Sequence, residues 1–229
     1  MVTKVCIFDA YGTLFDVAAA ARLAAQEPDF TRLAETWPQI ARDWRDKQLQ
    51  YTWIRALTAA HTDFWTVTAE ALDWALAAAG LDGDTALRAR LLELYHELPA
   101  YPEVHEMLTA LRAQGVPAAI LSNGAPSMLE AAVHSARIEA LLDDVLSVES
   151  VGVFKPDRRV YDLVGERFGT RAEEVLFVSA NGWDAASATG YGFATVWVNR
   201  MGQPVDRLPW QPHREVPDLS TVPQIAGTD

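Results

Sequence analysis

The sequence predicts an α/β fold, namely a doubly wound parallel sheet with a helical lobe inserted after the first strand. Two observations lead to this prediction: short apolar runs recur along much of the chain, and one long stretch contains only helical patterns. The composition agrees, because 50% of the 229 residues are apolar and 22% are charged, as in ordinary globular proteins. We therefore expect one domain that carries an inserted lobe.

Five continuous apolar runs are the expected strands, and helical patterns separate the last four. Because their apolarity is continuous rather than alternating, these strands should be buried on both faces of a parallel sheet. The expected strands are Val5 to Phe8, Pro117 to Leu121, Val145 to Val148, Val175 to Val178 and Ala194 to Val198, with helices at Pro126 to Arg137 and Pro156 to Phe168.

The stretch from about Asp16 to Pro102 contains no plausible buried strand and is expected to form successive helices. These are expected from Pro38 to Ala59, from Ala69 to Ala79 and from Asp84 to Leu98. Five of the eight tryptophans lie here and would give the lobe a small core. We therefore predict a Rossmann-like core of residues 1–15 and 103–229 and a cap of residues 16–102. The Pro-rich tail after Pro204 is expected to lie over the surface.

The charge balance and the single cysteine narrow the function classes. A formal net charge of −12 would repel nucleic acid and anionic membrane surfaces, so neither is expected as a partner. No apolar stretch is long enough to span a bilayer. Cys6 is the only cysteine and cannot form an internal disulfide, and the N-terminal residues lack the pattern of a signal peptide. These features favour a cytoplasmic protein.

Polar residues follow four of the expected strands directly. They are Asp9 to Thr13, Ser122 to Gly124, Ser150 to Asp157, which includes Lys155-Pro156-Asp157, and Ser179 to Asp184. Ligands of open parallel sheets bind at the carboxyl ends of the strands, so these segments should converge on one crevice. Asp9 would be an ionised nucleophilic carboxylate there. The alternative is that Asp9 only caps a turn.

Four of these segments resemble the motifs of the haloacid dehalogenase superfamily. The stretch Phe8 to Leu14 is similar to its first motif, Ser122 to Gly124 to its second, Lys155 to Asp157 to its third, and Asp184 lies where its fourth motif has an acid. The inserted helices match the cap that this superfamily places after the first motif. The resemblance implies the superfamily's Rossmann-like fold with Asp9 as the nucleophile.

Two positions depart from the pattern of the phosphatases in that superfamily. Tyr11 replaces the second Asp of the first motif, and Ser179 stands where a further acid is expected. Phosphatases need the second Asp as an acid and need Mg²⁺ to offset the charge of the phosphate. The sequence therefore favours a reaction that needs neither, and halide displacement is one, because halide leaves without a proton.

A narrower resemblance is to the (S)-2-haloacid dehalogenases, carried by Trp44 to Trp53 and by Ser179 to Asp184. It implies hydrolysis of short (S)-2-haloalkanoic acids to (R)-2-hydroxy acids and halide through an ester on Asp9, with no metal or cofactor. It also implies a small-molecule substrate and a homodimer. The alternatives are a phosphate-ester hydrolase with an atypical metal site and a non-catalytic protein with a decayed site.

Arg45 and Asn123 are the residues to which the resemblance assigns the departing halide. On a helix, Arg45 shares an apolar face with Ala41, Leu49, Trp53 and Ala56. If this face meets the crevice, the permanently charged guanidinium suits a forming anion. Otherwise Arg45 is a solvated residue beside Asp43 and Asp46.

Lys155 is expected to lie between two carboxylates and to keep both ionised. The carboxylates are those of Asp9 and Asp184, and the alternative is a surface lysine. Asp184 and Asn181 would position and activate water, while Ser122 and Thr13 would hold the substrate carboxylate. Thr13 and Ser179 are also consistent with helix caps.

Four aromatic residues are expected to wall a small apolar pocket, although each is also consistent with core packing. They are Tyr11, Phe64, Tyr161 and Trp183. The five histidines show no metal-ligand spacing, so no metal site is expected.

Overall fold

A computed structural model describes residues 3–227 and has a six-stranded parallel sheet of order β3-β2-β1-β4-β5-β6. The predicted α/β class is confirmed, and each of the five predicted strands is present within one residue of its expected ends. The strands are β1 (Val5–Phe8), β2 (Ala118–Ser122), β3 (Asp144–Ser147), β4 (Val175–Ser179), β5 (Ala194–Val198) and β6 (Arg214–Val216).

Strand β1 lies at the centre of the sheet, where the direction of the connections reverses. Cys6 is level with Ala118 of β2 on one side and with Leu176 of β4 on the other. Residues that follow β1, β2 and β4 therefore meet at one edge. This is the place where open α/β sheets bind ligands.

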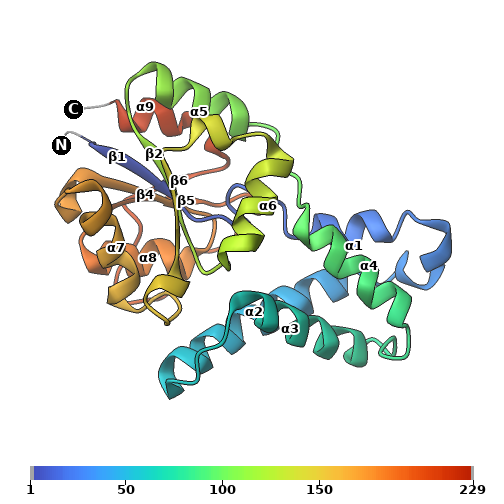
Figure 1. Ribbon diagram of the computed structural model, residues 1–229. Helices are drawn as coiled ribbons and strands as arrows, with labels where there is room; N and C mark the ends of the chain where they lie inside the picture. Colours follow the sequence, from blue (N-terminus) through green and yellow to red (C-terminus); the bar gives the residue numbers. More distant parts are fainter. Residues whose placement is uncertain (1–2, 228–229) are drawn as a thin grey trace.

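Helices cover both faces of the sheet, with α5 and α9 on one side and α7 and α8 on the other (Figure 1). The bounds are α1 (Ala19–Ala24), α2 (Trp37–Thr58), α3 (Phe64–Ala78), α4 (Thr85–His96), α5 (Val104–Ala113), α6 (Pro126–Ala136), α7 (Arg158–Phe168), α8 (Gly182–Tyr191) and α9 (Val222–Ala226). Between residues 3 and 227, no helix combines the length and the apolar character that crossing a lipid bilayer requires.

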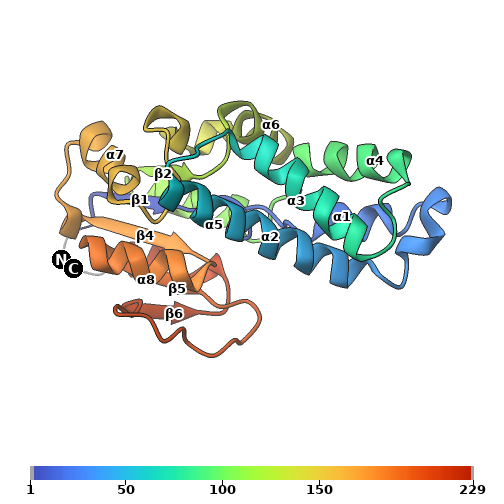
Figure 2. The ribbon, with the colours of Figure 1, turned by 90° about the horizontal axis from the view of Figure 1, so that it is seen from below.

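Helices α1 to α4 form a lobe beside the sheet (Figure 1). Helices α2 and α3 run side by side within it, as Figure 2 shows. The three predicted helices of this lobe are present as α2, α3 and α4, and α3 begins five residues earlier than predicted because Asp63 caps it by accepting from the Thr66 amide at 3.0 Å. Helix α1 and a 3-10 helix at Pro28–Leu33 were not predicted individually.

The two chain segments that connect the lobe to the sheet pair with each other. The Asp16 amide donates to the carbonyl of Pro99, and the Tyr101 amide donates to the carbonyl of Leu14, both at 2.9 Å. Phe15, between them, forms an antiparallel bridge with Ala100. The two connections are therefore tied together at this point.

The face that α2 buries differs from the predicted stripe. Its buried residues are Ile40, Trp44, Gln48 and Thr52, one position away from the stripe that contains Arg45. Polar Gln48 and Thr52 are buried here because they find hydrogen-bond partners, so the apolar pattern was misleading. The predicted stripe instead lies at the edge of that face, where Arg45 is half-buried.

The prediction for the tail after Pro204 was wrong in its second half. Residues 203–211 are exposed, but Arg214–Val216 then form β6 alongside β5. In the segment after β6, the side chains of Leu219, Val222 and Ala226 are buried in the hydrophobic core. The tail therefore completes the sheet and covers one of its faces.

Candidate active site

Asp9 follows β1 directly, and its carboxylate is held by three side chains that come from different parts of the chain. Its Oδ2 accepts hydrogen bonds from Thr13 Oγ1 at 2.9 Å and from Asn181 Nδ2 at 2.8 Å. Its Oδ1 accepts from Lys155 Nζ at 3.2 Å. Asp9 is 6% exposed, so the carboxylate is nearly closed off from solvent. These contacts fix the direction in which the carboxylate points.

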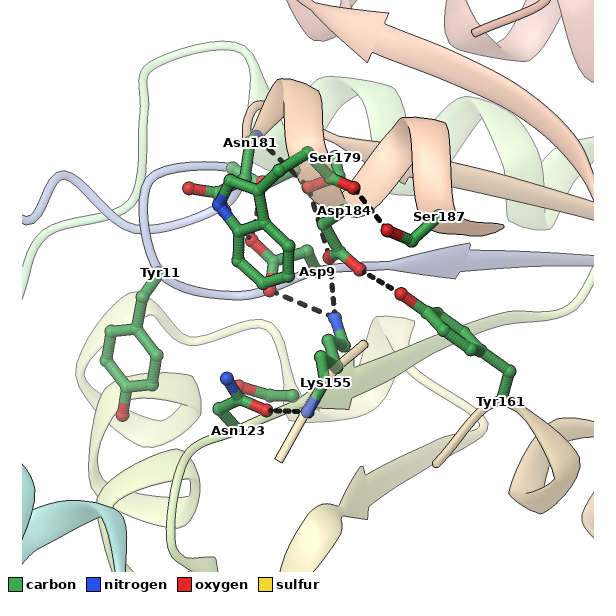
Figure 3. Close-up of polar contacts among 12 residues, drawn as sticks. Asp9, Tyr11, Asn123, Lys155, Tyr161, Ser179, Asn181, Asp184 and Ser187 are labelled. Atoms are coloured by element: carbon green, nitrogen blue, oxygen red, sulfur yellow. Dashed lines mark hydrogen bonds and ion pairs between the residues drawn. The ribbon is translucent and has the colours of Figure 1, made fainter. Parts of the chain in front are cut away.

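Lys155 lies between Asp9 and a second carboxylate, that of Asp184 (Figure 3). The ammonium donates to Asp184 Oδ2 at 2.8 Å, and the lysine is 1% exposed. Asp184 lies in the first turn of α8 and is fully buried. The predicted lysine between two carboxylates is therefore present.

Burial and charge act in opposite directions on these groups. Burial alone would lower the pKa of Lys155, but the negative charges of Asp184 and Asp9 outweigh it and raise the pKa. For Asp184, burial raises the pKa, and the contacts to Lys155 and Tyr161 only partly offset this. The lysine therefore stays charged, whereas Asp184 is a carboxylate with increased affinity for a proton. Such affinity suits a group that must accept a proton from water.

Asn181, Thr13 and Ser179 link the two carboxylates to the turn after β4. Asn181 bridges the site, because its amide nitrogen donates to Asp9 while its Oδ1 accepts from Arg45 at 3.2 Å. Thr13 Oγ1 also accepts from the Ala180 amide at 2.8 Å. Ser179 Oγ donates to Asp184 at 3.3 Å and accepts from the Asn181 amide. Both hydroxyls thus contact the carboxylates and also fix the loop.

Arg45 reaches the site from α2. Its Nη2 donates to the Tyr11 carbonyl at 2.9 Å, and its Nη1 donates to Gln48 Oε1 at 2.6 Å. The guanidinium is therefore turned towards Asn181 and away from solvent, which excludes a purely solvated Arg45. A permanent positive charge from the lobe thus faces the carboxylates of the core.

Asn123 and Ser122 shape the end of β2. Asn123 Oδ1 accepts from the Lys155 backbone amide at 2.9 Å, which leaves its amide nitrogen to point away from that backbone (Figure 3). Ser122 Oγ accepts from the Gly124 amide at 3.0 Å. Both residues are buried at the sheet edge next to Lys155.

Tyr11 and Phe64 are packed together, with ring centroids 5.7 Å apart. The Tyr11 ring also stacks on Tyr95, and burial raises the pKa of the Tyr11 hydroxyl far above its ordinary value. That hydroxyl is buried and has no hydrogen-bond partner within residues 3–227. Trp183 is half-buried at the start of α8. That Tyr11, Phe64 and Trp183 wall an apolar pocket stays a prediction.

The prediction that Tyr161 walls an apolar pocket was wrong, because its side chain lies in the core and contacts Asp184. Its hydroxyl donates to Asp184 Oδ1 at 2.7 Å, and its ring packs edge-on against Phe177 and Phe193. It is 1% exposed, behind Asp184 and within the sheet core. The structure thus makes Tyr161 a contact of the carboxylate rather than of an apolar pocket.

Sequence reasoning missed Gln48 and Tyr95, which support Arg45 from within the lobe. Gln48 Nε2 donates to Thr68 Oγ1 at 2.8 Å and to the Tyr95 hydroxyl at 3.1 Å. The signal that was available is the spacing of three residues between Arg45 and Gln48, which places both on one side of a helix.

The arrangement does not fit a divalent cation. Within residues 3–227, no three His, Cys, Asp or Glu side chains come together as a potential metal site. The Lys155 ammonium takes the position between Asp9 and Asp184 and would repel a cation there. A hard cation prefers several oxygen ligands, and these two carboxylates already bind the ammonium.

Comparison with known proteins agrees with this site. Residues 3–192 match the family model of haloacid dehalogenase-like hydrolases. The chain is 42% identical over 222 residues to (S)-2-haloacid dehalogenase 1 of Pseudomonas sp. (strain CBS-3), covering 97% of this chain and 96% of that protein. It therefore belongs to the haloacid dehalogenase-like hydrolases, and within them it groups with the (S)-2-haloacid dehalogenases.

Solved structures lead to the same family. An L-2-haloacid dehalogenase structure superposes with a TM-score of 0.92 at 40% identity, and each chain is covered completely. The L-2-haloacid dehalogenase of Xanthobacter autotrophicus with chloropropionic acid covalently bound superposes with a TM-score of 0.89 at 35% identity, again over both whole chains.

Proposed function

We propose that this protein is a hydrolase that converts short (S)-2-haloalkanoic acids to (R)-2-hydroxy acids and halide, without a metal, through an ester on Asp9. The observation that carries the proposal is the buried Lys155 ammonium bonded to both Asp9 and Asp184. The covalent chloropropionic acid complex of the Xanthobacter autotrophicus relative supports the ester.

In the first step, an oxygen of Asp9 attacks C2 of the substrate from the side opposite the halogen. Asp9 Oδ1 accepts one 3.2 Å hydrogen bond within the described chain, whereas Oδ2 accepts two shorter ones, so Oδ1 is the freer nucleophile. The C–O bond forms as the carbon–halogen bond breaks, and the halide leaves with the bonding pair. Because attack is from the back, the configuration at C2 inverts.

The halide departs towards the Arg45 guanidinium and the Asn123 amide. Arg45 is bound to the Tyr11 carbonyl and to Gln48, so it is held in place before the anion forms. A preorganised cation in a closed site stabilises a developing anion more than a mobile one in water does. Ser122 and backbone amides near Tyr11 are proposed to hold the substrate carboxylate, because the single hydroxyl proton of Thr13 is already donated to Asp9. Phe64, Trp183 and Tyr11 are proposed to contact its alkyl part.

In the second step, water attacks the carbonyl carbon of the Asp9 ester. The water gives a proton to Asp184, whose raised pKa favours this transfer. Lys155 offsets the charge that develops on the ester oxygen. The tetrahedral intermediate collapses with cleavage of the bond between the carbonyl carbon and the substrate oxygen, and this oxygen takes the proton from Asp184 to give the 2-hydroxy acid. Asp9 is restored as a carboxylate with an oxygen from water, and the remaining proton of the water is released to solvent.

Residues 16–102 are proposed to act as a cap that opens at the paired connections around Phe15 and Ala100. The proposal includes a cytoplasmic homodimer. Exposed Leu23 and Ile54 on the lobe support the dimer, and the single free cysteine, Cys6, is consistent with a reducing compartment. A monomeric mass in sedimentation equilibrium would reject the dimer. Recovery of the protein outside the cytoplasm in cell fractionation would reject the cytoplasmic location.

The test is chloride release from the two enantiomers of 2-chloropropionate in the presence of EDTA. We expect release from the (S) enantiomer alone, its loss in Asp9→Asn, and its persistence in Asp16→Asn, a matched change at a carboxylate that pairs with Arg22. A single turnover in H₂¹⁸O must place the label in Asp9. Label that passes directly into the product would reject the ester, and strict Mg²⁺ dependence with phosphate release would favour the phosphatase alternative.

A further inference from the structure

Two tryptophans join the lobe to the sheet beside the reaction centre. Trp53 of α2 and Trp183 of α8 meet edge-on, with ring centroids 5.4 Å apart and an interplanar angle of 84°. Trp183 lies between Asn181 and Asp184 in the chain, and Trp53 lies eight residues after Arg45, about 12 Å further along the helix. The contact therefore closes the site on the side where the last turns of α2 cross the core.

A cavity of about 490 Å³ is lined by both tryptophans. Its other walls include Ala56 and Leu57 of α2, Pro156, which follows Lys155, and Leu208 of the exposed loop. Its charged lining residue, Asp157, already has its carboxylate bonded to Arg159. The cavity therefore presents apolar walls and no free charge, so it fits an apolar group rather than a second carboxylate.

No hydrogen bond holds the Trp183 ring within the described chain, because its buried Nε1 has no partner. Among the described residues, the aromatic contact of the indole is the one with Trp53. Trp53 is itself 36% exposed. Removal of its ring would therefore open the space beside Trp183 and leave the Trp183 indole without this contact.

We propose that this cavity receives the alkyl substituent of longer 2-haloalkanoic acids, and that the Trp53 side chain is the gate that limits the length of that substituent. The inference rests on the proposed dehalogenase function. It adds a specificity-determining residue that does not touch the reacting atoms. Under this proposal the paired rings stand between the cavity and the reaction centre, so the wild type favours short substrates.

The first measurement compares kcat/KM for (S)-2-chloropropionate, (S)-2-chlorobutanoate and (S)-2-chlorohexanoate in the wild type and in Trp53→Ala. Burial of one methylene corresponds to about a fourfold change. We expect the ratio of the hexanoate to the propionate value to rise at least tenfold in Trp53→Ala. The matched control is Trp74→Ala, which removes an exposed tryptophan of the same lobe and should leave the ratio as in the wild type.

The second measurement does not depend on turnover. Titration calorimetry with unhalogenated butanoate, hexanoate and octanoate should show affinity that increases with length in Trp53→Ala and stays level in the wild type. If affinity depends on chain length to the same extent in the wild type and in Trp53→Ala, Trp53 does not limit the length of the substituent. If the wild type releases no chloride from (S)-2-chloropropionate, the proposed function fails, and the titration still decides whether the cavity accepts alkyl chains.

Discussion

Replacing Lys155 with Met tests the charge arrangement at the centre of the site. Methionine keeps most of the side-chain volume but removes the ammonium that donates at 3.2 Å to Asp9 and at 2.8 Å to Asp184. Both carboxylates then remain buried without a cation between them. Loss of one partner from a buried ion pair costs about 3–5 kcal/mol, so we expect the free energy of unfolding at pH 8 to fall by about that amount.

The loss should depend on pH in a direction that the pKa shifts define. In the wild type, the raised pKa of Lys155 provides stability that is complete below 10.5 and is lost as pH rises through its folded value. In the variant, Asp184 loses the positive charge that lowers its pKa, so this pKa rises further above 3.8. Its protonation then stabilises the folded state at low pH, and this stability is lost as pH rises through the folded value.

Lys155→Met should therefore recover stability relative to the wild type as pH falls from 8 to 5. Urea unfolding followed by tryptophan fluorescence at several pH values measures this difference. The double variant Lys155→Met with Asp184→Asn has one carboxylate fewer and should be more stable at pH 8 than Lys155→Met alone. If Lys155→Met lowers the free energy of unfolding by less than about 1 kcal/mol at pH 8, and by the same amount at pH 5, the buried charges do not contribute as argued.

Three further predictions follow from single contacts. A Cβ added at Gly124 would lie 2.7 Å from the Tyr11 ring, so Gly124→Ala should cost about 1–3 kcal/mol in urea unfolding and lower kcat/KM. Burial raises the pKa of Asp184 and the Tyr161 hydrogen bond lowers it, so Tyr161→Phe should move the acid limb of the pH–kcat/KM profile to higher pH. The backbone hydrogen bond from Arg171, together with Lys4, lowers the pKa of Glu174 from 4.5 to about 2. The contribution of Glu174 to the free energy of unfolding should therefore be present above pH 4.5 and be lost as pH falls towards 2. Glu174→Gln should reduce the dependence of the free energy of unfolding on pH in this range.

Each of these predictions has a matched control. Gly83→Ala adds a methyl group where no atom lies within 4 Å, and it should be neutral. Tyr191→Phe removes a hydroxyl that donates to Asp162, and it should leave the acid limb in place. Glu173→Gln removes the charge of the neighbouring residue and should keep the slope. If a control variant changes the measured quantity as much as its test variant does, the contact proposed to cause the change is not responsible for it.

The convergence of the strand ends was predictable because it needs only two facts that the sequence contains. Buried parallel strands are continuous apolar runs, and their carboxyl ends share one edge of the sheet. Asp9 follows such a run directly, whereas Asp184 and Lys155 lie six and seven residues after one. Their mutual contacts follow from topology, without knowledge of any side-chain packing.

The face of α2 and the strand β6 were not predictable in this way. Gln48 is buried on α2 because partners from α3 and α4 satisfy its amide, and a polarity pattern cannot contain that information. Strand β6 has three residues, of which only Val216 is buried, so it carries no periodic signal. Its position depends on the free edge of β5, which is a property of the assembled sheet.

The charge of the closed site places a limit on how it can hold its substrate. Asp9 and Asp184 are two acidic side chains, and Lys155 and Arg45 are two basic ones, so the formal charges of these four groups cancel before a ligand arrives. A haloacid adds one further carboxylate, while Lys155 is already bonded to both buried carboxylates. This balance favours the proposal that neutral donors such as the Ser122 hydroxyl and backbone amides bind the substrate carboxylate. It also favours the proposed role of Arg45 towards the halide that the first step releases.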